Sequence, residues 1–303
     1  MSDGNHNSNT DIALWGVTGS GKTWLIHALA RELAWYTDKD PDFSYSLKDS
    51  EDQYIRSLHA PTAEKIAATL EGEDHLWIFE RKAKENKTSR SHQVSSHAHQ
   101  ILIHDNPGKD LKDALDEYAP DNDSMVSRIL KLSRNIIILL DPTTLPDPKN
   151  EKSVSSSENI FSKTDYERLI GTLVDIVTSN NTNVRLAVCV SKADTIKIHL
   201  PTDEYVRVMF GDGVMRAFSS SRVTKQFFRI SSVGVLRSGD GKKKSNIDDN
   251  STGLKDETRW NPVNVAAPFF WLFESIEKER ISVGDFLGDR KKYYIPYPPP
   301  RQV

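Results

Sequence analysis

The chain has 303 residues, of which 37% are hydrophobic and 27% are charged, and its formal net charge is −3. This apolar content is sufficient for one large domain or two modest ones with a packed core. A surface that binds duplex nucleic acid usually carries a strong basic excess, so nucleic acid is not an expected partner. A single cysteine, Cys189, excludes an intramolecular disulfide and is typical of a reducing compartment.

Apolar runs along the chain are short, and none approaches the roughly 20 residues that cross a bilayer. The N-terminal residues 1–10 are polar and lack the apolar segment of a signal peptide. We therefore expect a soluble, cytoplasmic protein without a membrane span.

Short apolar runs alternate with helical periodicities along most of the chain. The expected strands cover residues 12–15, 75–80, 94–105, 135–140, 184–190 and 227–230. The expected helices cover residues 23–36, 61–70, 110–118, 163–179, 203–219 and 262–280. The strands at 75–80 and 94–105 would form a hairpin around a polar turn. The pattern predicts an α/β fold with a doubly wound, mostly parallel sheet and one antiparallel edge hairpin.

Less periodic segments divide the rest of the chain. We expect a disordered tail at 1–10, a single domain at 11–283 and a proline-rich extension at 284–303. Within the domain, 38–50 has the composition of a loop, and 239–258 is polar and charged, as in a mobile insertion.

The segment Gly16 to Thr23 has the sequence GVTGSGKT and satisfies the pattern G-x-x-x-x-G-K-[ST] in full. Glycines let successive N–H groups converge on an oxyanion, and the following helix adds the positive end of its dipole. Lys22 is expected to reach the β- and γ-phosphates, and the Thr23 hydroxyl to ligate Mg²⁺. The residues predicted to contact the nucleotide here are Gly16, Thr18, Gly19, Ser20, Gly21, Lys22, Thr23 and Trp24. With a strand before it and a helix after it, the segment predicts a P-loop NTPase.

A second motif, His104 to Gly108 (HDNPG), ends the apolar run at 101–103. Taken alone, Asp-x-Pro-Gly is as typical of a turn. At the tip of a buried strand, Asp105 can hold a magnesium-bound water, and it is predicted as a metal ligand together with Thr23. The Gly108 N–H can meet the γ-phosphate, which makes Gly108 a predicted catalytic residue beside Lys22.

Two further motifs follow strands. Ser191-Lys192-Ala193-Asp194 comes after the strand at 184–190, and Ile230 to Gly234 comes after the last strand. The carboxyl ends of strands in an open sheet are where ligands bind. The alternative for the first of these motifs is a solvated Lys/Asp pair.

In order, the four motifs resemble those of the translation-factor-related (TRAFAC) class of P-loop GTPases, over about residues 11 to 235. The resemblance implies that Asp194 accepts hydrogen bonds from guanine, that the stem of Lys192 lies over the ring, and that the backbone at Ser232 contacts the guanine oxygen. Ser191 departs from the asparagine of the class, which weakens the brace between base loop and phosphate loop. The long segment after the first helix and the sequence at 260–265 also resemble bacterial double-GTPase families.

Several parts of such a site are ambiguous or missing. A switch threonine should lie in the extended switch region 37–74, where Thr62 and Thr69 are candidates, and Thr88 is a poorer one. Lys109 stands where many members of the class carry a water-orienting glutamine, and Thr18 would crowd an arginine finger. Candidate charge donors within the chain are Arg56, Arg81 and Arg90. Intrinsic hydrolysis is therefore expected to be slow.

Histidines at positions 92, 97, 99 and 104 invite a metal interpretation. No cysteine joins them, so an exposed strand face or a pH-sensitive contact is favoured. Cys189 is expected to be a small core residue.

The sequence thus predicts a GTP-binding switch protein with Mg²⁺-dependent, slow hydrolysis. GTP, GDP and Mg²⁺ are the expected ligands, and a protein effector or regulator is an expected partner. Segments 37–74 and 106–120 would change conformation when the γ-phosphate leaves. The alternatives are an ATPase or small-molecule kinase on the same loop, and a nucleotide-binding module that does not hydrolyse.

Overall fold

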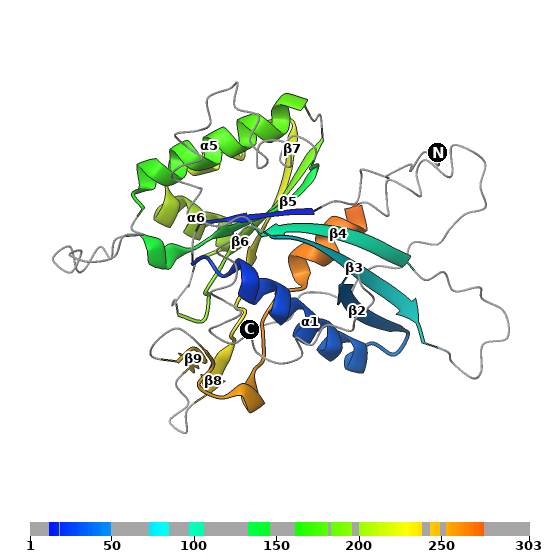
Figure 1. Cartoon of the computed structure of the whole chain (residues 1–303). Coiled ribbons are helices and arrows are strands. Elements are labelled where there is room, and N and C mark those ends of the chain that lie inside the picture. Colours follow the sequence, from blue (N-terminus) through cyan, green and yellow to red (C-terminus); the bar gives the residue numbers. More distant parts are fainter. Residues whose placement is uncertain are drawn as a thin grey trace, which may run out of the picture.

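A computed structural model of the chain is shown in Figure 1. It describes residues 12–17, 19–49, 73–84, 97–105, 133–145, 161–180, 183–195, 200–237, 243–248 and 253–275. Only the backbone is described for residues 49, 73–76, 97–105, 180, 237 and 243. The expected helices at 61–70 and 110–118, the tail at 1–10 and the extension at 284–303 lie outside these residues.

A parallel sheet forms the centre of the fold. Its strands are β1 (Ile12–Gly16), β5 (Asn135–Leu140), β6 (Val184–Val190) and β7 (Val223–Arg229), hydrogen-bonded in that order. All three pairings are parallel, so the carboxyl ends of the four strands lie at one edge of the sheet. The mostly apolar β5 and β6 lie in the middle of this sheet, as their sequences predict.

Helices cover both faces of the parallel sheet, and alternate residues of each strand supply the two cores. Leu14, Ile137 and Cys189 pack with α1 (Lys22–Lys39) and the helix at 267–275. Trp15, Ile138 and Val188 pack on the other face with α5 (Lys163–Asn180), α6 (Thr202–Phe210) and α7 (Asp212–Ala217). Figure 1 shows α5 above the sheet and α1 below it. The doubly wound α/β fold is confirmed, and the pKa of the Cys189 thiol is raised by its complete burial in this core.

A second, antiparallel sheet corrects one expectation. Residues 38–50 were expected as a loop, but Phe43–Asp49 forms strand β2, which pairs with β3 (Glu73–Ala83). Strand β3 pairs in turn with β4 (His97–Asp105), so this part is a three-stranded sheet rather than a hairpin. The loop prediction was wrong because Phe43, Tyr45 and Leu47 alternate with polar residues, and this period of two buries one face of a strand. Strand β4 lies beside β1, so the antiparallel sheet is next to the β1 edge of the parallel sheet.

The expected single helix over 203–219 is also corrected. Gly211 has φ 102° and separates α6 from α7. Phe210, Val214 and Phe218 are fully buried at a spacing of four residues, so the apolar period continues across the break and did not reveal it. Among the described residues, no helix is long and apolar enough to cross a membrane.

Where the sequence predicts a mobile insertion at 239–258, part of the segment has defined structure. Strand β8 (Val235–Arg237) pairs with β9 (Lys243–Ser245), and a 3₁₀ turn, η5, covers Glu257–Arg259. The buried side chain of Asn246 donates to the Asp256 carbonyl at 2.9 Å and accepts from the Asp256 N–H at 3.0 Å. Both ends of this amide are hydrogen-bonded, so Asn246 connects the end of β9 to the residue that precedes η5.

Gly234 is expected to be intolerant of a side chain. Its φ is +76°, and a Cβ built there would lie 2.2 Å from the Asn261 carbonyl oxygen. The left-handed conformation costs about 1–3 kcal/mol for a non-glycine residue, and the backbone contact adds to it. We expect Gly234→Ala to lower the free energy of unfolding by at least about 2 kcal/mol in urea titrations. Gly171→Ala is the matched control: it lies inside α5 with no atom within 4 Å of a Cβ, and should raise stability by about 0.5–1 kcal/mol. Equal effects of the two changes would contradict the prediction.

Candidate nucleotide-binding site

The first, third and fourth of the predicted motifs lie at the carboxyl edge of the parallel sheet, together with Asp141. Gly16 ends β1, Asp141 follows β5, Ser191 follows β6, and Ser231 lies just beyond β7. Because the four strands are parallel, these residues lie on the same side of the sheet although they are far apart in sequence. This is the edge at which an open α/β sheet binds ligands.

The glycines of the first motif have distinct structural roles. A Cβ at Gly16 would lie 2.9 Å from the Leu139 Cβ, so only glycine fits between the loop and β5. Gly19 and Gly21 have φ values of 75° and 93°, and a Cβ at either would face open space. The loop therefore turns through left-handed glycines beside space that a ligand can fill.

Helix α1 begins directly after this loop. Its N-cap residue, Gly21, makes no side-chain hydrogen bond to the first turn, and the first turn contains no acidic residue. The N-terminal N–H groups thus have no side-chain cap, which is the arrangement that binds phosphate at a helix N-terminus.

Two side chains of the loop are polar and buried. The Nζ of Lys22 donates to the Gly16 carbonyl at 2.8 Å and approaches the Val17 carbonyl at 3.5 Å, and the residue is 7% exposed. The Ser20 hydroxyl is buried and has no hydrogen-bond partner among the described residues. An ammonium held over the loop and a hydroxyl with a free proton both suit an anionic ligand.

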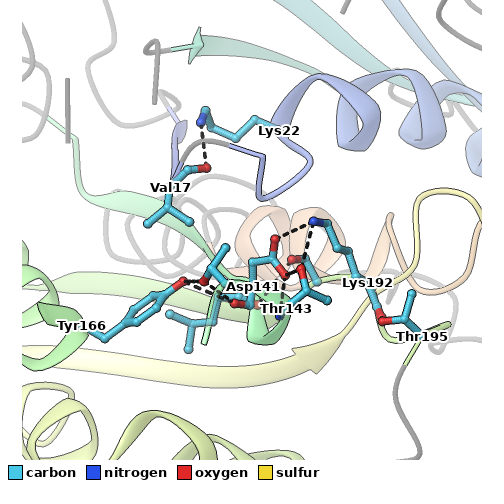
Figure 2. A network of polar contacts seen from close by, with 10 residues as sticks. Val17, Lys22, Asp141, Thr143, Tyr166, Lys192 and Thr195 are labelled. Carbon is cyan, nitrogen blue, oxygen red and sulfur yellow. Dashed lines mark hydrogen bonds and ion pairs between the residues drawn. The ribbon is translucent and has the colours of Figure 1, made fainter. Parts of the chain in front are cut away.

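Lys192 is held by a residue that the motifs did not include. Figure 2 shows its Nζ directed at the buried carboxylate of Asp141, with an ion-pair distance of 2.7 Å, and at the Thr143 hydroxyl at 3.2 Å. The other Asp141 oxygen accepts from the N–H and the hydroxyl of Thr143 at 2.9 and 2.7 Å. The Asp141 carbonyl accepts from Tyr166 at 3.3 Å, and burial raises the pKa of that phenol. Asp141 directly follows the apolar strand β5, as Ser191 follows β6, and Asp105 is the last residue of β4. This position at a strand end was the one sequence signal that could have identified Asp141 as a site residue.

Asp194 is oriented by two serines. Ser231 donates to Oδ1 at 2.6 Å, and Ser245 of β9 donates to Oδ2. Ser232 is the residue of that loop predicted to contact the guanine oxygen through its backbone, and its carbonyl accepts from the Trp260 indole at 2.8 Å. Ser191, where the GTPase class has asparagine, is buried and donates to the Leu140 carbonyl at 3.3 Å, so its side chain braces β5.

Other predicted site residues lie outside what the structure describes. These are Thr18, Gly108, Lys109, Thr62, Thr69, Thr88, Arg56, Arg90 and the side chain of Asp105. Arg81 is described and buried, with its guanidinium 4.0 Å from the centre of the Phe43 ring. In the antiparallel sheet, Arg81 of β3 therefore packs on the Phe43 side chain of β2. No cluster of three or more metal-ligating His, Cys, Asp or Glu side chains occurs within the described part of the chain.

No protein-family model and no curated protein sequence matches the chain. Solved structures with a similar backbone include the translation elongation factor SelB of Methanococcus maripaludis, at 14% identity and a TM-score of 0.30. The match covers 74% of this chain and 30% of the elongation factor, so the chain spans less than a third of that protein's length.

Two others are nearer to the chain in size. A nucleolar GTP-binding protein 1 of Plasmodium falciparum matches at 11% identity and a TM-score of 0.35, over 91% of this chain and 92% of that one. The signal recognition particle receptor SRb of Chaetomium thermophilum, in its GTP complex with SRX, matches at 14% identity and a TM-score of 0.35, over 76% and 96%. At these identities and TM-scores the comparisons carry no argument about this chain, and its α/β fold rests on its own strands and helices.

Proposed function

We propose that this chain binds guanine nucleotides with Mg²⁺ and acts as a switch protein that hydrolyses GTP slowly. The observation that carries the proposal is the meeting of three elements at one sheet edge: the glycine loop, the Lys192–Asp141 pair and the serine-braced carboxylate of Asp194. A phosphate cradle beside a fixed carboxylate suits a ligand with a polyphosphate at one end and N–H donors at the other.

The phosphate end of the ligand would lie over the loop Gly16 to Thr23. The N–H groups at the start of α1 would donate to the phosphate oxygens, aided by the helix dipole. Lys22 would exchange its carbonyl partners for the β- and γ-phosphates.

Oxygen ligands for Mg²⁺ are available beside this loop. Thr23 lies in the first turn of α1, and Asp105 is the last residue of β4, whose neighbour β1 leads into the loop. A hydroxyl and a carboxylate are ligands that Mg²⁺ prefers, and the ion would neutralise charge that develops on the phosphates.

The base would lie between Lys192 and Asp194. Asp141 holds the ammonium of Lys192 at one end, which leaves the aliphatic stem as an apolar surface for a ring. The Asp194 carboxylate would accept from the two neighbouring N–H donors of guanine. Adenine presents a donor and an acceptor on the corresponding edge, so the same carboxylate would reject it.

Slow turnover follows from the residues near the γ-phosphate. Gly108 would donate to the γ-phosphate, but Lys109 follows it where a residue that orients water would be needed. The segments 37–74 and 106–120 would respond to loss of the γ-phosphate, and a protein effector or regulator would read that change. We place this activity in the cytoplasm.

The test of the proposal is Asp194→Asn. We expect the affinity for GTP to fall by about 10- to 100-fold, because one acceptor is replaced by a donor that faces a donor of the base. The affinity for ATP should stay unchanged, and fluorescent analogues of both nucleotides would measure the ratio. Asp203→Asn, an exposed residue at the start of α6, is the matched control and should change neither affinity.

Tighter binding of ATP than of GTP by the unaltered protein would favour the ATPase or kinase alternative. Guanine selectivity that survives Asp194→Asn would contradict the role of Asp194. Single-turnover rates of GTP and ATP hydrolysis would separate the third alternative. If GTP binds but is not cleaved, the chain is a nucleotide-binding module that does not hydrolyse.

A further inference from the structure

The β8–β9 hairpin brings a second hydroxyl to the carboxylate of Asp194. Ser231 donates to Oδ1 at 2.6 Å from the loop after β7, and Ser245 donates to Oδ2 from β9. The contact between Ser245 and Asp194 joins residues 51 positions apart in sequence. Each carboxylate oxygen therefore carries one hydroxyl donor.

The two hydroxyls are held in the same manner. The Ser231 oxygen accepts from the Gly234 N–H at 2.9 Å, and the Ser245 oxygen accepts from the Ile247 N–H at 3.3 Å. A hydroxyl that accepts from a fixed backbone N–H has its own proton directed elsewhere, and in both cases that proton is available for Asp194. The plane of the carboxylate is thus set by two backbone-anchored donors.

The β8–β9 hairpin that carries Ser245 is itself fixed to the loop Ile230 to Gly234, which follows β7. Strand β8 follows that loop directly, and Val235 and Ser245 are paired in the register of the hairpin. The Asn246 N–H donates to the Gly234 carbonyl at 3.2 Å, and the Trp260 indole donates to the Ser232 carbonyl at 2.8 Å. Movement of Ser245 away from Asp194 would break several of these bonds together.

We propose that Ser245 is a specificity-determining residue for guanine, acting by positioning Asp194. This inference rests on the proposed function. An ionised carboxylate offers about four lone-pair sites, and the two serines occupy one on each oxygen. One site on each oxygen remains, in a fixed plane, for two neighbouring donors. Guanine presents two such donors and adenine does not.

Ser191 takes no part in this positioning. The Ser191 hydroxyl donates to the Leu140 carbonyl, so its side chain contacts β5 and not Asp194. Within the described residues, the side chains that hold Asp194 are those of Ser231 and Ser245. The β8–β9 hairpin thus supplies one of the two side chains that orient the Asp194 carboxylate.

The experiment measures dissociation constants for GDP and ADP with the full chain and three variants. Ser245→Ala is expected to weaken GDP binding about tenfold, the effect of one hydrogen bond to a charged group, and to leave ADP binding unchanged. Ser245→Thr keeps the hydroxyl and should restore the GDP/ADP ratio. Lys244→Ala is the matched control, since Lys244 precedes Ser245 on the same strand with an exposed side chain; it should leave the ratio unchanged.

A GDP/ADP ratio that Ser245→Ala leaves unchanged would overturn the inference, whether the two affinities stay constant or fall together. A fall in both would mean that Ser245 only supports the fold. If the unaltered protein shows no preference for GDP over ADP, the proposed function fails as well. A preference that is present in the unaltered protein and persists in Ser245→Ala overturns the role of Ser245 alone.

Discussion

Lys22→Ala is expected to lower the affinity for a nucleoside triphosphate by more than about a hundredfold. The ammonium lies over the loop on the carbonyls of Gly16 and Val17, at the start of α1. Its replacement removes at least two charge-assisted hydrogen bonds to phosphate and leaves the negative charge of the ligand unneutralised. Isothermal titration with a non-hydrolysable triphosphate would measure the loss.

Lys39→Ala provides the control for this change. Lys39 lies in the last turn of the same helix and is exposed, so its removal changes the net charge equally but not the loop. Both variants should unfold at similar urea concentrations. Triphosphate binding by Lys22→Ala within a factor of three of the unaltered protein would contradict the assignment of the phosphate site.

Glu32→Ala is expected to lower the free energy of unfolding by about 3–5 kcal/mol, the range for loss of a buried charged partner. Glu32 is 0% exposed, and its carboxylate accepts from the Asn264 N–H at 2.9 Å and from the Ala266 N–H at 2.7 Å. These N–H groups lie at the start of the helix at 267–275, where an anion is also favoured by the helix dipole. The carboxylate of α1 therefore caps a helix more than 200 residues later in the chain, and alanine would leave buried N–H groups unsatisfied.

Urea unfolding followed by tryptophan fluorescence would measure this loss. Asp38→Ala removes an exposed acid from the same helix and should change stability by less than about 0.5 kcal/mol. Glu32→Gln keeps one acceptor oxygen, so an intermediate loss is expected. A loss below about 1 kcal/mol for Glu32→Ala would show that the cap is not an important contact.

The local sequence was sufficient to predict those strands and helices that depend on residues close together in the chain. The apolar runs of β5 and β6 predicted buried parallel strands with the bounds that the structure has. The apolar run at 12–15 and the helical spacing after Thr23 predicted the strand before the glycine loop and the helix after it, because both patterns depend on residues close together in sequence. The strand β2 was missed although its signal was also local, because its buried residues alternate with Ser44, Ser46 and Lys48 at the period of two of a strand.

The contacts that orient the candidate site could not be derived in this way. Asp141 meets Lys192, and Ser245 meets Asp194, only because parallel strands and a hairpin bring distant segments to one sheet edge. A sequence pattern shows which side chains follow strands, but not which of them point at each other. The polar composition of 239–258 likewise gave no sign of the contacts between the buried amide of Asn246 and Asp256.

The sequence by itself determined the α/β fold, the glycine loop at Gly16 to Thr23 and the set of strand ends at which we expect a ligand to bind. These follow from hydrophobic period and from the conformational freedom of glycine, which act over a few residues. The tertiary structure decided that β2 extends the antiparallel sheet, that Asp141 holds Lys192, and that two serines from different loops set the plane of Asp194. Each of these contacts joins residues that are far apart in sequence and that meet only when the strands are arranged in the sheet. A short stretch of sequence therefore cannot predict them.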